Sequence, residues 1–248
     1  MADILSQEEI DALLDVVEDD ECDNLLENSY NNHRQITLYD FKRPNRVRKE
    51  QLRTIRMVHD RTSRDLSNKL SQILEDIVEI QLHSVDQMTY GEYLMSLPNP
   101  TSFNIFDIRP LDGQFALEVN PSIIYPIIDR LLGGSGEPYE AVRELSNIEN
   151  KLFEKITNTI LLSISHGWNT VFEIAPFLRE TYNTANHVMI TSNNEIVIMV
   201  VFEIIVGYSS GMVNVAYPVN NILPILDYLS EKDVKGIRWV NQKKSVRE

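Results

Sequence analysis

The pattern closest to a catalytic or ligand-binding motif is a short glycine-rich run, Gly133, Gly134, Ser135 and Gly136. A phosphate-binding loop places such glycines between a strand and the N-terminus of a helix, generally with a lysine for charge. This run instead follows a segment of helical periodicity and fits neither the dinucleotide-binding nor the Walker spacing. Two interpretations stay open: a helix stop with a turn, or an exposed loop that a partner's backbone can approach closely.

The other residues with chemical potential are scattered along the chain. Cys22 is the single cysteine, which excludes an internal disulfide and a cysteine-built zinc site. No Gly-x-Ser-x-Gly turn marks a nucleophilic serine. The histidines lack metal-ligand spacing and any acid, base or nucleophile motif, which favours surface or structural roles; they are His33, His59, His83, His166 and His187. The sequence therefore predicts no catalytic residue, no metal site and no cofactor.

The length and composition suit one main folded domain. A chain of 248 residues with 43% hydrophobic residues can bury one generous core. Its apolar runs fall short of the about 18 residues that cross a bilayer, and its N-terminus is acidic where a secretory signal is basic. We therefore expect a cytoplasmic protein with no membrane insertion.

The formal charge of -14 is unevenly distributed along the chain. Residues 1–30 carry eleven acids and no base, whereas residues 31–64 carry ten bases and three acids. The bases of residues 42–64 could contact nucleic acid, but the overall acidity and the lack of interleaved aromatic residues argue against it. Unequal charge predicts different roles for these regions.

The N-terminal segment is predicted to be a short recognition helix. Ser6 and Glu9 have the spacing of a capping box, which marks a helix start. An apolar stripe follows at intervals of one helical turn, formed by Ile10, Leu13, Leu14 and Val17. Isolated helices this short are marginal in water, so this one needs a partner to cover its stripe. Residues 18–37, acidic and rich in asparagine at first, are expected to be a flexible tether.

The folded domain is expected to span residues 38–231. One long helix, broken once at most, is predicted over residues 45–82, and its first half carries a row of basic residues, either a solvated face or a partner site. Later predicted elements are strands at 102–108, 115–119 and 196–206, and helices at 121–132 and 146–167. The tail of residues 232–248 is short and basic.

An internal repeat predicts the fold class. Residues 115–131 resemble residues 212–229 in pattern and identity, each being a strand, a proline and a helix. Two similar halves sharing one sheet would produce this repeat. The sequence therefore predicts an α/β (α+β) domain with pseudo-two-fold symmetry, in which a mixed or antiparallel sheet is flanked by long and short helices.

Three separated motifs also occur in the same order as in one known family. They are Leu5–Leu14 (LSQEEIDALL), Tyr39–Pro44 (YDFKRP) and Ile128–Gly136 (IDRLLGGSG). Through them the chain resembles the flagellar motor switch protein FliM family from residue 1 to about residue 230. The family normally continues into a FliN-like C-terminal domain, and this chain stops at Glu248, which puts docking onto FliN in doubt.

The resemblance implies an adaptor in the cytoplasmic ring at the flagellar basal body, on the inner face of the membrane, that controls rotation direction in chemotaxis. It implies a CheC-like middle domain that packs against neighbouring FliM copies. It assigns binding of the rotor protein FliG to Gly133, Gly134, Ser135 and Gly136. It assigns binding of the phosphorylated regulator CheY to residues 1–17, through Leu5, Ser6, Gln7, Glu9, Ile10, Asp11, Leu13 and Leu14.

Two alternatives remain on sequence grounds. A CheC-like aspartyl-phosphate phosphatase acting on CheY needs a Glu-x-x-Asn pair on a long helix. Laid on the second long helix, that pattern meets Asn150 and Phe153, and Glu154 followed by Thr157 is a partial match. The first long helix has Glu75 followed three positions on by Val78. The other alternative is a purely structural ring subunit whose N-terminal helix packs onto its own domain.

Overall fold

The computed structural model describes residues 47–139 and 143–233 of the chain. These residues all belong to one compact unit, which begins at Asn45. Its elements in order are α3 (Lys49–Leu74), β1 (Val78–Thr89), α4 (Tyr90–Ser96), β2 (Ser102–Arg109), β3 (Gln114–Val119), α5 (Pro121–Leu131), α6 (Asn147–Trp168), β4 (Ala175–Tyr182), β5 (Ile196–Val206), β6 (Ser209–Pro218) and α7 (Val219–Asp233).

The strands form one six-stranded sheet in the order β1-β5-β6-β3-β2-β4, and every pairing is antiparallel. The first half of the domain contributes α3, β1, β2, β3 and α5, and the second contributes α6, β4, β5, β6 and α7. The first strand of each half pairs with the hairpin of the other half, and β3 and β6 meet at the centre. The predicted pseudo-two-fold α+β fold is confirmed.

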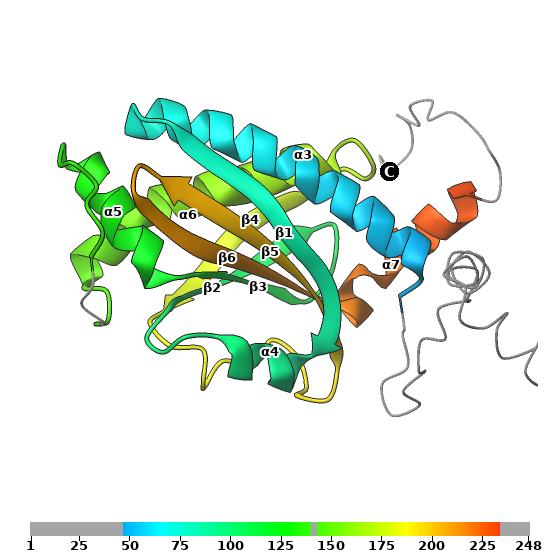
Figure 1. Cartoon of the computed structure of the whole chain (residues 1–248). Helices are drawn as coiled ribbons and strands as arrows, with labels where there is room; N and C mark the ends of the chain where they lie inside the picture. Colours follow the sequence, from blue (N-terminus) through cyan, green and yellow to red (C-terminus); the bar gives the residue numbers. More distant parts are fainter. Residues whose placement is uncertain (1–46, 140–142, 234–248) are drawn as a thin grey trace, which may run out of the picture. The chain divides into compact units, whose positions relative to one another are not determined.

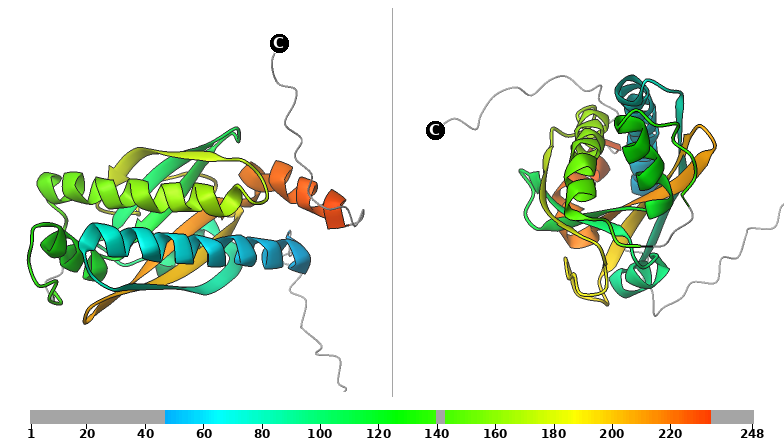
Figure 2. Two further views of the ribbon diagram at one scale, coloured as in Figure 1. Left: turned by 90° about the horizontal axis from the view of Figure 1, so that it is seen from above. Right: turned by 90° about the vertical axis from the view of Figure 1, so that its left-hand side faces the viewer.

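The two long helices cover one face of the sheet. α3 and α6 lie side by side across it, with α5 at one end and α7 at the other (Figures 1 and 2). The buried positions of α3 recur at intervals of three and four residues, among them Ile55, Val58, Leu66 and Leu70. This periodicity gives the helix one apolar face, whose burial is the main stabilising contribution of such a helix.

A smaller core lies on the opposite face, beneath α4. Tyr90 and Tyr93 of α4 pack with Phe103, and Ala116 and Ala216 provide close-packed small side chains. Cross-strand pairing sets Ala116 directly opposite Ala216 at the centre of the sheet. The sheet is therefore covered on both faces, which explains why its strand β5 is nearly continuous apolar sequence.

A carboxyl group is buried on this second face. Glu118 lies on β3 with no exposed surface. Its side chain accepts hydrogen bonds from the Thr101 hydroxyl and, at 2.7 Å, from Asn214 Nδ2. Burial raises the pKa of Glu118 to about 7, although these hydrogen bonds act in the opposite direction.

One predicted element is wrong. The long helix expected over residues 45–82 ends at Leu74, because Glu75 takes the left-handed conformation with φ 51°. The segment that follows is β1, whose eleven paired residues lie against β5. α4 was also missed, although Thr89 and Glu92 form its capping box with the Thr-x-x-Glu spacing.

The remaining predicted helices and strands are confirmed within a few residues. α6 begins at the predicted cap, since the Ser146 hydroxyl accepts from Glu149 N and the Glu149 carboxylate accepts from Ser146 N. The predicted basic row of α3 is exposed along the described part of that helix; it comprises Arg48, Lys49, Arg53, Arg56, Arg61 and Arg64.

His59 lies in the interior, between α3 and the sheet. The imidazole of His59 is fully buried, and its Nδ1 lies 2.8 Å from the Ile55 carbonyl oxygen. Its Nε2 lies 2.9 Å from the Tyr217 hydroxyl, which donates if Nδ1 carries the ring proton. Trp168 packs edge-on against the same ring. Burial lowers the pKa of His59 to about 4, so the ring is neutral at pH 7.

We predict that His59 makes the domain less stable in acid. The unfolded chain binds a proton at this residue below pH 6.5, whereas the folded chain resists it until about pH 4. The neutral buried ring therefore contributes about 3 kcal/mol to the free energy of unfolding. This contribution is fully present above pH 6.5 and is lost progressively as the pH falls to about 4. The check is urea unfolding of the wild-type protein and His59→Gln at pH 7.5 and pH 4.5.

The stability advantage of wild type over His59→Gln should shrink at the lower pH. All other titrating groups are shared by the two proteins and cancel in this difference. Parallel pH profiles would show that the buried imidazole does not titrate as described.

Candidate functional site

The connection between α5 and α6 begins at the α5 end of the sheet (Figure 1), and the structure describes its residues 132–139 and 143–146. It begins with a tight helix stop. Gly133 N donates to the Arg130 carbonyl at 3.0 Å, and Gly134 N donates to the Asp129 carbonyl at 2.8 Å. This pair of bonds is a Schellman motif, in which a left-handed residue satisfies the last carbonyls of a helix.

Three of the glycines are required by this geometry. Gly133 has φ 90° and Gly136 has φ 72°, values that side chains rarely adopt. A Cβ on Gly134 would lie 2.3 Å from the Asp129 carboxylate oxygens. The same carboxylate accepts a hydrogen bond from Gly136 N at 2.8 Å. Asp129 therefore folds the loop back over the end of α5, and we call residues 133–136 the glycine loop.

The glycine loop and the end of α5 are each bonded to a neighbouring turn. Ser209, at the start of β6, donates its hydroxyl to the Gly136 carbonyl at 3.3 Å. Arg130, in the last turn of α5, forms an ion pair with Asp76 in the turn between α3 and β1. The loop thus has a fixed shape, and Ser135 at its tip is exposed.

The electrostatics of the glycine loop do not suit a phosphate. The loop follows the C-terminus of a helix, where the helix dipole places partial negative charge. Its adjoining charged residue is Glu137, which is exposed. A backbone contact with another protein fits these properties better than anion binding does.

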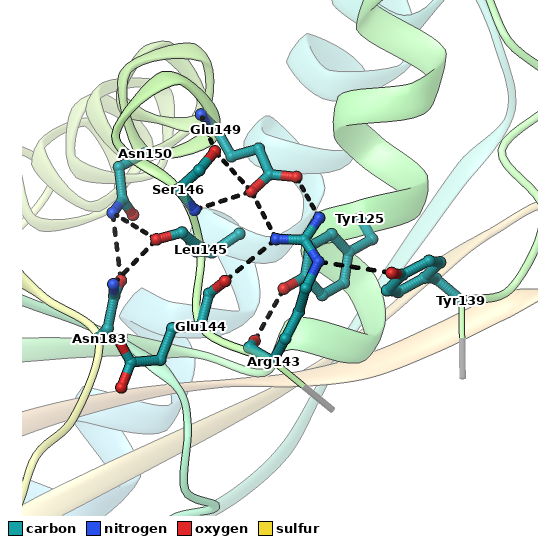
Figure 3. Close-up of polar contacts among 9 residues, drawn as sticks. All are labelled: Tyr125, Tyr139, Arg143, Glu144, Leu145, Ser146, Glu149, Asn150 and Asn183. Atoms are coloured by element: carbon teal, nitrogen blue, oxygen red, sulfur yellow. Dashed lines mark hydrogen bonds and ion pairs between the residues drawn. The ribbon is translucent and has the colours of Figure 1, made fainter. Parts of the chain in front are cut away.

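The far end of the connection is held by Arg143 (Figure 3). The guanidinium group of Arg143 forms two hydrogen bonds with the Glu149 carboxylate, at 2.8 and 2.5 Å. It also lies over the rings of Tyr125 and Tyr139, at 4.7 and 5.7 Å from their centroids. The Tyr125 hydroxyl in turn donates to the Arg143 carbonyl at 2.8 Å. We call this group the Arg143 clamp.

The clamp joins α5 to the start of α6. Hydrogen bonding to Arg143 lowers the pKa of Glu149 to about 2, so this carboxylate stays ionised at neutral pH. Two amides continue the network, because Asn183 Nδ2 donates to the Leu145 carbonyl at 2.9 Å and Asn150 Nδ2 donates to Asn183 Oδ1 at 3.1 Å. The sequence analysis missed the clamp, and its one visible signal was the capping box that contains Glu149.

The partial phosphatase pattern does not form a site. Phe153 and Thr157 are buried, and the Thr157 hydroxyl donates to the Phe153 carbonyl. The carboxylate of Glu154 instead pairs with Lys151 at 2.6 Å. Glu75 lies in the cap after α3 and not within the helix. These side chains therefore cannot hold a phosphoryl group and its attacking water between them.

Other predicted features are placed as follows. Within residues 47–139 and 143–233, no cluster of His, Cys, Asp and Glu could hold a metal ion. Among the helices of the same residues, none has the length and apolar content needed to span a bilayer. The predicted recognition helix lies outside the described residues, including Leu5, Ser6, Gln7, Glu9, Ile10, Asp11, Leu13 and Leu14.

Comparison with known proteins gives one consistent family. A family model described as flagellar motor switch protein FliM matches residues 48–234. FliM of Treponema pallidum is 36% identical over 94% of this chain and 67% of its own length. FliM of Bacillus subtilis is 33% identical over 92% of this chain and 69% of its own length.

Solved structures agree with this result. FliM from Helicobacter pylori, solved in a complex with FliG, has a TM-score of 0.71 and 52% identity, covering 73% of this chain and 100% of that chain. The middle domain of FliM from the same organism has a TM-score of 0.68 and 50% identity, covering 73% of this chain and 99% of its own. Thermotoga maritima FliY, at 18% identity and a TM-score of 0.64, covers 75% of this chain and 98% of its own and shares the fold.

We predict that Gly134→Ala destabilises the domain. The added methyl group would collide with the Asp129 carboxylate that orders the glycine loop. Overpacking of this kind lowers the free energy of unfolding by about 1–3 kcal/mol. Chemical denaturation measures the change, and Ser135→Ala at the exposed neighbouring position is the matched control. Equal stability of the two variants would contradict the described loop geometry.

Proposed function

The chain belongs to the FliM family of flagellar motor switch proteins, and we propose that it is a non-enzymatic adaptor of the rotor ring. In this proposal the glycine loop binds FliG, and the N-terminal helix captures phosphorylated CheY. Binding of the regulator then biases the direction of rotation. No covalent step is assigned to any residue of the chain.

The observation that carries the FliG assignment is the construction of the glycine loop. A partner's backbone can approach Gly133 closely, since no atom lies within 4 Å of the place a Cβ would take. The loop is held by the Asp129 carboxylate on one side and by Ser209 on the other. A surface that is already ordered loses little entropy on binding, which favours affinity. The complex solved for the H. pylori relative contains FliG.

The CheY assignment rests on the sequence of residues 5–17. Ile10, Leu13 and Leu14 provide the apolar anchors of a helix that binds in a groove, at the required spacing of three and four residues. The acids around them would face a basic rim, which increases the association rate more than the final affinity. The acidic residues 18–37 would act as the tether, keeping the captured regulator close to the ring.

The remaining parts of the proposal follow from family membership. Residues 38–231 form the domain that packs beside neighbouring FliM copies, in the cytoplasm at the flagellar basal body. Residues 232–248 serve as a basic linker. Docking onto FliN is not assigned to the residues of this chain.

We predict that replacing Leu13 and Leu14 together with Asp removes binding of phosphorylated CheY. Two anchors that are buried on binding would become charged. An anchor of this kind contributes about 2 kcal/mol, so the loss of one alone should lower affinity roughly 30-fold, and the double variant should lose more. Isothermal titration with CheY in both phosphorylation states measures the effect. Thermal unfolding of the domain should not change. Undiminished binding by the double variant would refute the assignment.

We predict that Ser135→Arg weakens binding of FliG roughly tenfold or more, because a long charged side chain at the tip of the glycine loop blocks close approach of the backbones. Biolayer interferometry with immobilised FliG measures the affinity. Asn186→Arg is the matched control, since Asn186 is an exposed polar residue in the loop between β4 and β5. Equal affinities for the two variants would contradict docking at the glycine loop.

A further inference from the structure

The second face of the sheet carries a buried polar cluster where the two halves of the domain meet. Glu118 of β3 is paired across the central strands with Asn214 of β6, whose side chain donates to one carboxyl oxygen at 2.7 Å. The Thr101 hydroxyl donates to the other oxygen. On its second side, Glu118 is paired with Phe103 of β2. Glu118, Thr101 and Phe103 are all buried, so the carboxyl group lies in the interior of the domain.

This carboxyl group has no cation to balance a negative charge. Within residues 47–139 and 143–233, no Lys, Arg or His forms an ion pair with Glu118. Both of its hydrogen-bond donors are neutral groups. A buried carboxylate without a paired cation is costly, which favours the neutral carboxylic acid. Burial therefore outweighs the two hydrogen bonds and raises the pKa of Glu118 to about 7.

The hydroxyl group of Tyr93 on α4 lies in the same part of the interior. Its ring packs against Phe103, the strand partner of Glu118, with the centroids 6.4 Å apart. The hydroxyl is buried and forms no hydrogen bond within the described residues. Burial, and then the charge of Glu118, raise the pKa of Tyr93 well above its ordinary value. Tyr93 is therefore packed next to Glu118 without a hydrogen bond to it.

α4 covers this cluster together with the loop between β4 and β5, residues 183–195. Tyr90 N donates to the Glu195 carbonyl at 2.8 Å, and Gly91 N donates to the Asn193 carbonyl at 2.9 Å. The Tyr90 hydroxyl donates to the Val188 carbonyl at 2.8 Å. Figure 1 shows the helix and the loop side by side. These bonds make α4 and the loop one unit, which we call the α4 cover.

We propose that Glu118 is a proton-controlled latch that holds the α4 cover closed. With its proton bound, the neutral carboxyl group stays in the interior and the cover remains in place. Without the proton, the carboxylate is stabilised by water, and displacement of the cover is the movement that admits water to it. The cover therefore opens more easily as the pH rises. This device is independent of the proposed binding sites.

Other titratable groups lie on the elements packed around Glu118. They are Tyr90, Glu92 and Tyr93 of α4, Asp107 of β2, Tyr182 of β4, Glu195 of the loop and Glu203 of β5. Burial raises the pKa of Tyr90 to about 12, so this phenol, like that of Tyr93, stays protonated at neutral pH. Among the described carboxyl groups, only Glu118 is fully buried. The latch is therefore assigned to Glu118.

The test is hydrogen–deuterium exchange of the full chain between pH 5 and 8, corrected for the intrinsic pH dependence of exchange. Exposed Glu118 has the ordinary glutamate pKa of 4.5, against about 7 in the closed domain. The opening equilibrium of the α4 cover should therefore rise roughly 40-fold between pH 5 and 7 and level off at higher pH. Glu118→Gln, which is neutral at every pH, should remove this rise. Glu203→Gln is the matched control and should keep it, since Glu203 is a partly buried glutamate of the same sheet.

Three results would overturn the latch. One is an α4 cover whose opening in the wild-type protein does not depend on pH. Another is a Glu118→Gln variant that keeps the wild-type pH response. The third is equal exchange of α4 and α6 at every pH, which would show that opening is global unfolding.

A second measurement decides the question if Glu118→Gln does not fold. Carbon NMR of the wild-type protein follows the titration of the Glu118 carboxyl group directly. A midpoint near pH 7 that coincides with the rise in α4 exchange supports the latch. A midpoint at the ordinary glutamate value would refute it.

Discussion

The fold depends on strand exchange between its two halves. β1 belongs to the first half and is paired only with β5 of the second, while β4 of the second half is paired only with β2 of the first. Neither half can complete its three strands alone, so the sheet forms only when the halves combine. The central β3–β6 pairing then brings Ala116 and Ala216 opposite each other, with a core on each face. The end carrying the glycine loop is built on this shared sheet, because its turns come from both halves.

Sequence analysis identified the elements whose pattern is local. The repeat of strand, proline and helix was visible in residues 115–131 and 212–229, and the Ser146 cap marked the start of α6. β1 was missed for a physical reason. Ile77 and Ile80 are three residues apart, which fits a helical spacing, and the deciding interaction is the pairing of β1 with β5, more than a hundred residues later. Tertiary pairing therefore overrides the local preference.

The candidate site was likewise predictable from the sequence only in part. The glycine loop was visible because a helix stop needs glycine at fixed positions, although the closeness of Gly134 to Asp129 required the structure. The Arg143 clamp was not predictable, since its members are a tyrosine on α5, an arginine in a loop and a glutamate on α6. Its cation–π and bidentate contacts leave no periodic pattern in the sequence.

Two buried groups that titrate in the acid range, His59 and Glu118, have a joint consequence for the tolerance of the domain to acid. His59, beneath α3, disfavours folding as pH falls from 6.5 to about 4. Glu118, on the other face, does the opposite, because its raised pKa makes the folded state take up a proton between about pH 7 and 4.5. Over the range that they share, one loss offsets the other gain. The combined contribution of His59 and Glu118 to the free energy of unfolding therefore changes little between about pH 6.5 and 4.5.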